Sequence, residues 1–200
     1  MLSHAKTTFL EGIKAFNGKW IKELSTRFKS DSKGSKSTAD ALLEHHTRAF
    51  ILDKLIAALG WRSEADAGGP SNIFTEAFLQ SATPKATTLF LDYLGFNAKK
   101  DVPLLVFEAK RFIAHPPKYL IMLGRSKKPA ASFASSKEAL SVAFKDSGWV
   151  KGEWKEHIEQ LTKYYNAIVK EFKLPPSVMA IGNGDWLVIL QEPALIFSGH

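Results

Sequence analysis

The stretch LFLDYLGFNAKKDVPLLVFEAKRF, from Leu89 to Phe112, contains two apolar segments separated by a polar turn. The segments cover residues 89–96 and 103–109. Both are short, rich in residues that favour β-structure and bounded by turn residues, so we predict that they form two buried strands. This pair of strands organises the rest of the fold, because it also carries the most informative charged residues of the chain.

Three charged residues interrupt these apolar segments. Asp92 lies in the middle of the first, and Glu108 and Lys110 lie at the end of the second. Side chains alternate along a strand, so Glu108 and Lys110 project to one face and Ala109 to the other. If the strands pair, Asp92 can join them. Because ionised groups in apolar strands are costly unless they are paired or bind a metal, we expect the three charges to converge at one end of a sheet.

Two carboxylates and one ammonium make a plausible site for a hard divalent cation. Mg²⁺ takes oxygen ligands, usually one or two carboxylates with waters and phosphate oxygens. The alternative is a solvated ion pair between Glu108 and Lys110, since a lone E-x-K occurs by chance in many chains. Asp92 favours the metal site, because a strand on the protein surface would not be apolar on both sides of an acid.

The pattern resembles the PD-(D/E)XK nuclease motif, with Leu91 at the position of the proline that gives the motif its name. More widely, the chain resembles the N-terminal nuclease domain of type I restriction enzyme R subunits. The matching segments follow the family's order and span roughly Leu42 to Leu190. They are Glu44-x-x-Thr47-Arg48, Leu59-Gly60-Trp61, Asp92-Tyr93, Val106-Phe107-Glu108-Ala109-Lys110, Gln160-x-x-x-Tyr164 and Gly182-Asn183-Gly184-x-Trp186.

The resemblance implies a restriction-endonuclease-like α/β fold, with a mixed central sheet flanked by helices. It also implies a metal site for Mg²⁺, with Mn²⁺ as a possible substitute. In that site Asp92, Glu108 and the backbone carbonyl of Ala109 bind the metal, and Lys110 orients or activates the attacking water. Further roles follow for three residues on helices: Glu44 as an extra acid, Gln160 as a partner of the lysine or water, and Tyr164 as a contact to the DNA backbone. For Glu44, an ion pair with Arg48 one helical turn away is an equally good explanation.

Two regions follow from the remaining patterns. Residues 1–36 are predicted to form an amphipathic helix, roughly Ala5 to Phe28, and a polar linker. Residues 37–200 are predicted to form the nuclease domain. Its first helix runs to about Leu59 and ends at Gly60. The remaining elements are expected at Ile73–Leu79 (strand), Glu153–Phe172 (helix), and Ser177–Ile181 and Trp186–Leu190 (strands around a Gly-Asn-Gly-Asp turn). The order of helix, three strands, helix and two strands is that of a layered α/β fold.

A basic stretch follows the strand that carries Lys110. Residues 111–137 contain six Lys or Arg, interleaved aromatic residues and no Asp or Glu. Such a stretch suits contact with a phosphate backbone. The alternative is a solvated loop on a protein that is basic throughout. The residues that we expect to bind DNA here are Arg111, Lys118, Arg125, Lys127 and Lys128.

The bulk composition agrees with an anionic partner. The formal net charge is +7 and the pI is about 9.5, which favours nucleic acid. The chain has no cysteine, and it shows neither a signal peptide nor an apolar run long enough to span a membrane. From the sequence we therefore expect a soluble cytoplasmic protein.

The absence of other catalytic motifs reduces the number of functions that the sequence supports. No phosphate-binding G-x-x-x-x-G-K-[ST] loop is present, so the type I motor is not encoded in this sequence. We therefore expect a Mg²⁺-dependent DNA endonuclease of the restriction type. Its expected partners are DNA and, in a type I system, a helicase or translocase domain or restriction-modification subunits outside this sequence. The alternative is a non-catalytic DNA-binding or interaction module on a nuclease-like fold. RNA cleavage, which shares the chemistry, is a weaker third option.

Overall fold

The computed structural model describes residues 47–63, 70–81, 87–111, 117, 121–122, 140, 143–144 and 150–198. The expected N-terminal helix and linker, and the start of the following helix, lie outside these residues. The described helices are η2 (Arg48–Leu52, a π-helix), α5 (Asp53–Ala58), α7 (Glu153–Phe172) and α8 (Pro193–Phe197). The described strands are β1 (Ile73–Gln80), β2 (Thr88–Phe96), β3 (Pro103–Ala109), β4 (Ile121–Met122), β5 (Val150–Lys151), β6 (Val178–Gly182) and β7 (Leu187–Gln191).

Five of these strands form a mixed sheet in the order β1-β2-β3-β6-β7. All neighbours are antiparallel except β3 and β6, which are parallel and are joined by a crossover that contains α7. Strands β2 and β3, at the two segments predicted to be strands, are antiparallel neighbours, as a connection of only six residues requires. The expected α/β class with a mixed sheet is likewise confirmed.

Helix α7 has the range predicted from the sequence, and it covers one face of the sheet. Its apolar side is buried against the strands through Trp154, Ile158, Leu161 and Tyr165. The helix ends at Lys173, whose left-handed conformation (φ 58°) caps it just before Pro175 and Pro176. The short helix α8 packs on the same side, where the ring of its Phe197 lies 5.4 Å from that of Tyr165.

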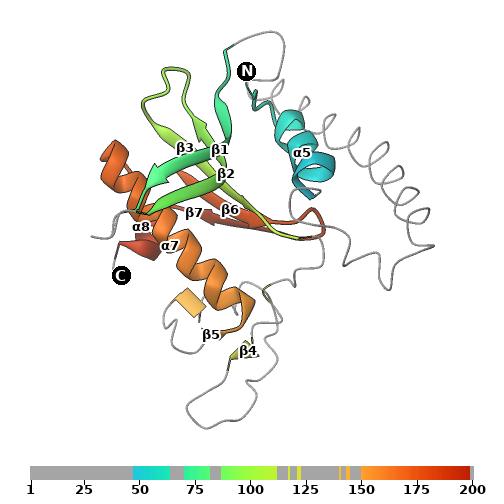
Figure 1. Cartoon of the computed structure of the whole chain (residues 1–200), viewed down its shortest axis with the longest axis vertical. Helices are drawn as coiled ribbons and strands as arrows, with labels where there is room; N and C mark the ends of the chain where they lie inside the picture. The colour runs from blue at the N-terminus through green and yellow to red at the C-terminus, as the bar shows by residue number, and fades with distance from the viewer. Residues whose placement is uncertain are drawn as a thin grey trace, which may run out of the picture.

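The opposite face of the sheet is covered by η2 and α5, so the sheet lies between two helical layers (Figure 1). The apolar contacts there join Ile51, Leu52 and Ile56 to residues of β1, β2 and β3. Gly60, with φ 87°, ends this helical segment, as predicted. Trp61 then packs against Gly95, where an added Cβ would lie 2.6 Å from the indole ring.

Three local features differ from the sequence-based expectation or were not anticipated by it. Residues 48–52 adopt a π-helix, whereas the apolar pattern predicts a continuous α-helix. The helix α8 and the two-residue strands β4 and β5 are too short to give a periodic signal. Strands β6 and β7 each lie one residue further along the chain than predicted. None of these differences alters the sheet.

Among the described helices, we find none whose length and apolar character would allow it to cross a lipid bilayer.

Candidate active site

Glu108 and Lys110 form a buried ion pair at the end of β3. Nζ of Lys110 lies 2.7 Å from Oε1 of Glu108, and Lys110 and Glu108 are only 6% and 2% exposed. Strand β3 is the central strand, so its end is enclosed by β2, β6 and α7. Two charges in so dry a place must neutralise one another to be tolerated. The pair is therefore buried, whereas the alternative considered from the sequence was a solvated ion pair.

A chain of hydrogen bonds runs from this pair to helix α7 and back to the sheet. Lys110 donates to Oε1 of Gln160 at 3.0 Å, and Nε2 of Gln160 donates to the Tyr164 hydroxyl at 2.6 Å. The Tyr164 hydroxyl in turn donates to the backbone carbonyl of Phe90 on β2 at 2.7 Å. The spacing of one helical turn between Gln160 and Tyr164 places both side chains on the helix face that looks toward β2 and β3.

Tyr164 lies inside the protein in this arrangement. It is almost fully buried, and burial together with the negative charge of Glu108 raises the pKa of its hydroxyl. The hydroxyl therefore stays protonated and acts as a donor to Phe90. The expected contact from Tyr164 to a DNA phosphate thus has a competitor within the fold, where the residue ties α7 to β2.

Asp92 sits where β2 and β3 separate. The last paired residues at this end are Tyr93 and Phe107, and the next β3 donor toward β2 is the N–H of Ala109. That N–H donates to Oδ2 of Asp92 at 2.8 Å. Since backbone N–H groups of a strand point sideways in the plane of the sheet, the carboxylate lies at the fork between the strands, beside the Glu108–Ala109 peptide. The structure thus brings Asp92, Glu108 and Lys110 to one end of the β2–β3 pair.

Arg48 is a residue of this site that the sequence did not assign. Its Nη1 lies 3.0 Å from Oδ1 of Asp92 and 3.2 Å from Oε1 of Glu76, and its guanidinium stands over the Tyr93 ring. Burial disfavours the charged form, but the negative charge of Asp92 and further contributions from Tyr93 and Glu76 outweigh it and raise the pKa of Arg48. Glu76 is exposed at the sheet edge, and it is paired with Arg48.

The hairpin turn between β6 and β7 supports the site from the other side. Asn183 is fully buried, and its Nδ2 donates to the backbone carbonyl of Arg111 at 3.0 Å. Its Oδ1 accepts from the N–H groups of Asp185 and Trp186, which closes the turn.

Gly184 in the same turn has φ 89° and its Cα faces Ile51 of η2, so no side chain fits there. The turn thus fixes the course of the chain directly after Lys110.

His157 lies on the same side of α7 as Gln160, packed edge-on against Trp154. Burial and the nearby charge of Lys110 lower the pKa of His157 to about 4. The imidazole is therefore neutral at physiological pH, and a second positive charge next to Lys110 is avoided.

The remaining predicted site residues fall into two groups. Ala109 and Arg111 are described: the Ala109 side chain is buried beneath η2 and α5, and Arg111 is exposed. The other group lies outside the described residues, so the expectations for it stay predictions: Glu44, Lys118, Arg125, Lys127 and Lys128. Within the described part of the chain, no group of three or more acidic, His or Cys residues gathers in a way that could hold a metal.

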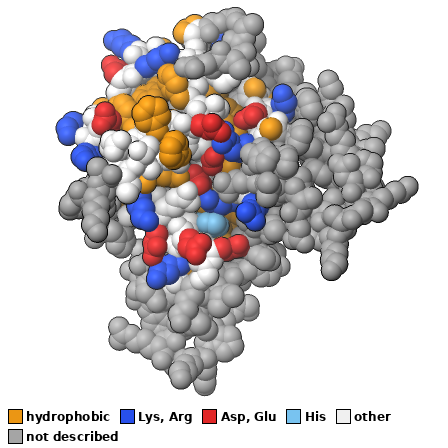
Figure 2. Space-filling view, in the orientation of Figure 1, with side chains coloured by type: hydrophobic (Ala, Val, Ile, Leu, Met, Phe, Trp, Pro, Cys, Tyr) orange, Lys and Arg blue, Asp and Glu red, His pale blue; other side chains and the backbone are white. Residues whose placement is uncertain are grey.

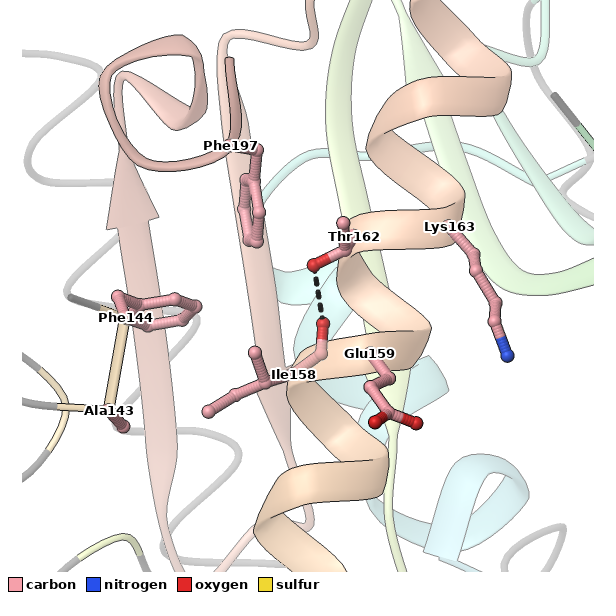
Figure 3. A pocket seen from close by; sticks show the side chains of 7 residues that line it. All are labelled: Ala143, Phe144, Ile158, Glu159, Thr162, Lys163 and Phe197. Atoms are coloured by element: carbon pink, nitrogen blue, oxygen red, sulfur yellow. Dashed lines mark hydrogen bonds between the residues drawn. The ribbon is translucent and has the colours of Figure 1, made fainter. Parts of the chain in front are cut away.

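Figure 2 shows red and blue side chains close together near the middle of one face, beside an apolar patch. A cavity of about 270 Å³ lies elsewhere, on a different side of α7 (Figure 3). It is lined mainly by apolar groups, among them Phe144, Ile158 and Phe197, and the Thr162 hydroxyl at its wall donates to the carbonyl of Ile158. The cavity therefore takes no part in the charged site.

Comparisons with protein-family models, curated proteins and solved structures gave no match for this chain.

Proposed function

We propose that this protein is a Mg²⁺-dependent endonuclease that hydrolyses DNA phosphodiester bonds, of the restriction type. The observation that carries the proposal is the gathering of Asp92, Glu108 and Lys110 at one end of the β2–β3 pair, with Lys110 hydrogen-bonded to both Glu108 and Gln160. Residues far apart in the sequence supply this set, and its members are the types that phosphodiester hydrolysis requires.

The chemistry of the oxygen donors fits Mg²⁺, and Mn²⁺ as a substitute. Asp92, Glu108 and the Ala109 carbonyl would hold the ion, since Mg²⁺ in such sites takes one or two carboxylates and completes its shell with water and phosphate oxygens. When bound, the ion would supply positive charge to the phosphate and lower the pKa of a water. Arg48 and Lys110 now balance the two carboxylates.

Lys110 is the residue we assign to the attacking water. Its ammonium carries three N–H donors, and two of them are committed to Glu108 and Gln160. The remaining donor can be offered to a water or to a phosphate oxygen. Because Gln160 is itself fixed by Tyr164, the lysine is held in one orientation before substrate arrives, which is how a site of this kind gains its rate.

Arg48 has a positioning role in this proposal. Its contacts to Asp92 and Glu76 fix the Asp92 carboxylate from the side of η2, while Ala109 fixes it from β3. A carboxylate held by two partners keeps its geometry in the absence of the metal.

One observation favours the second candidate, a non-catalytic DNA-binding or interaction module. Each carboxylate already has a protein cation as its partner, so the site is electrically balanced by the chain alone. A type I restriction context, with a helicase or translocase domain or restriction-modification subunits as partners and a cytoplasmic location, belongs to the proposal in either case.

Cleavage assays distinguish the two candidates. Supercoiled plasmid is incubated with wild type, Lys110→Ala and the surface control Lys155→Ala, with Mg²⁺, with Mn²⁺ and with chelator. The endonuclease predicts nicking or linearisation by wild type and Lys155→Ala only with metal, and a loss of at least about 100-fold for Lys110→Ala, as is typical for a group acting in the transition state. DNA binding without cleavage by every variant, under all three conditions, would establish the module instead.

A further inference from the structure

Two phenylalanines form an exposed aromatic pair on the sheet. Phe78 on β1 and Phe90 on β2 are directly opposite one another and are 70% and 66% exposed. Phenylalanine is usually buried, and an exposed apolar patch on a folded protein generally marks a binding surface. Their strand neighbours Leu79 and Leu91 point into the core under α7. The two rings therefore stand on the other face, the one that carries Arg48.

This aromatic pair is continuous with the part of the candidate active site that Arg48 and Asp92 form. Glu76 and Asp92, the two acids bound by Arg48, lie two residues from Phe78 and Phe90 along the same strands. Two residues of strand span about 7 Å, so the rings lie close to the acids that Arg48 binds. Figure 2 shows the apolar patch over β1 and β2 next to the charged side chains.

The backbone beneath the rings is fixed by the site itself. The carbonyl of Phe90 accepts the hydrogen bond from Tyr164, which belongs to the chain of hydrogen bonds that leads through Gln160 to Lys110. On the far side of the rings, Gln80 donates to the Thr88 hydroxyl at 3.5 Å, a polar pair that could meet the edge of a base. The face thus presents charged, aromatic and polar residues in succession.

We propose that Phe78 and Phe90 are a stacking platform for unpaired nucleobases next to the scissile phosphate. The preferred substrate is then DNA with a single-stranded or locally unwound segment at the cleavage position. Bases in an intact duplex stack on one another and offer no free face, whereas unpaired bases stack readily on exposed aromatic rings. This inference rests on the proposed function, because it takes the charged site as the place where the phosphate binds.

A protein partner fits the patch less well. Two phenyl rings that are about two-thirds exposed offer on the order of 300 Å², because a buried aromatic side chain covers about 150–250 Å². A specific protein interface needs about 1,200–2,000 Å² in total. The patch is also bordered by Glu76 and Arg48 and by the polar pair Gln80 and Thr88. A small aromatic platform with polar borders on a chain of net charge +7 fits a polyanion that carries flat apolar groups.

The test is a binding experiment without Mg²⁺, so that cleavage does not interfere. Three DNA probes of one sequence are compared: a single strand, a blunt duplex, and a duplex with a central unpaired bubble. The variants are Phe78→Ala/Phe90→Ala, Phe78→Leu/Phe90→Leu, and Phe78→Tyr/Phe90→Tyr. The matched control is Leu195→Ala, which removes a similarly exposed apolar side chain from α8. Thermal melting checks that every variant folds.

Stacking predicts that the Ala and Leu double variants bind the single strand and the bubble about 5-fold to 100-fold more weakly, with less than about 2-fold change for the blunt duplex. The Tyr double variant and Leu195→Ala should bind like wild type. Leu separates the two explanations, since it keeps the apolar surface and lacks the aromatic face. An equal loss of affinity on all three probes, or wild-type binding by the Leu double variant, would overturn the proposal.

Two further outcomes separate this inference from the proposed function. Wild type and the Ala double variant could both cleave with Mg²⁺, and each could cut the bubble and the blunt duplex at equal rates. In that case the endonuclease stands and the platform is refuted. If nothing is cleaved and the probe preference is present, the platform stands and the endonuclease is refuted. Self-association in sedimentation runs without DNA that disappears in the Ala double variant would assign the patch to a second copy of the chain and overturn the inference.

Discussion

The N–H of Ala109 donates its hydrogen bond to the side chain of Asp92, at 2.8 Å, and not to a backbone carbonyl of β2. The carboxylate therefore takes the place of a ladder acceptor at the point where the two strands separate. It satisfies a buried donor and at the same time keeps Asp92 next to Glu108. A residue of the candidate metal site is in this way also part of the sheet, which makes its structural and chemical roles separable by experiment.

Replacing Asp92 by Ala should lower the free energy of unfolding by about 1–3 kcal/mol, because it leaves the buried N–H of Ala109 without its acceptor and removes one of the two acids that bind Arg48. Denaturant unfolding followed by circular dichroism measures the change. Glu76→Ala is the matched control, since it removes the other, exposed acid bound by Arg48 and should cost less than about 1 kcal/mol. Equal effects of the two substitutions would contradict the structural role of Asp92.

The buried pair at the end of β3 predicts strong coupling in a double-mutant cycle. Lys110→Met leaves the buried charge of Glu108 without its cation and should lower the free energy of unfolding by about 3–5 kcal/mol. Glu108→Leu should cost a similar amount for the same reason. The double variant Glu108→Leu/Lys110→Met removes both charges and should recover most of this stability, although it remains inactive. A double variant whose destabilisation equals the sum of the single ones would show that the two charges do not interact.

Much of the fold could be predicted because its strands carry their signal locally. The segments around Asp92 and Glu108 are short, apolar and bounded by turn residues, and the structure has strands at both. The short connection between them made an antiparallel pair the only reasonable choice, and the steady apolar spacing from Trp154 to Tyr165 identified α7. These features depend on neighbours in the sequence, so one sequence is enough to find them.

The parts of the site that were missed depend on interactions between distant segments. Arg48 was considered only as a partner for Glu44, four residues away, whereas in the described structure it binds Asp92 and Glu76. Only the packing of η2 on the sheet creates that interaction. Phe78 and Phe90 belong to segments that read as ordinary strands, and nothing local shows that one face of each is left uncovered at this position.

His157 should make the stability of the protein depend on pH below neutrality. Its pKa is about 4 in the folded state, because of burial and the charge of Lys110, and about 6.5 when the chain is unfolded. As the pH falls from 6.5 to 4, the unfolded state takes up the proton first, so the contribution of His157 reduces stability over this window and is absent above it. Unfolding measured at several pH values for wild type and His157→Gln should give a difference that is constant above about pH 7 and changes in favour of the variant as the pH falls through this window. A difference that is constant over the whole range would contradict the lowered pKa.

Catalysis and DNA affinity should reside in different residues. Glu108→Ala should abolish metal-dependent cleavage and leave DNA binding unchanged or slightly tighter, because it removes a negative charge next to the phosphate. Neutralising Arg125, Lys127 and Lys128 to Gln, in the acid-free stretch that follows Lys110, should have the opposite effect. Affinity should fall for all sequences alike, which is the behaviour expected of residues that bind phosphate.

The salt dependence of binding measures this second effect. The slope of log affinity against log salt concentration should decrease by about 0.9 for each phosphate that the variant no longer neutralises, and so by about 2.7 if all three cations bind duplex DNA. The control removes the same net charge elsewhere, with Lys99, Lys155 and Lys163, all exposed, changed to Gln. A triple variant whose slope matches that of this control would show that net charge alone sets the affinity. The DNA would then have to be bound by other residues, for which the lysines at positions 1–36 are the next candidates, because that stretch has the other dense group of cations in the chain.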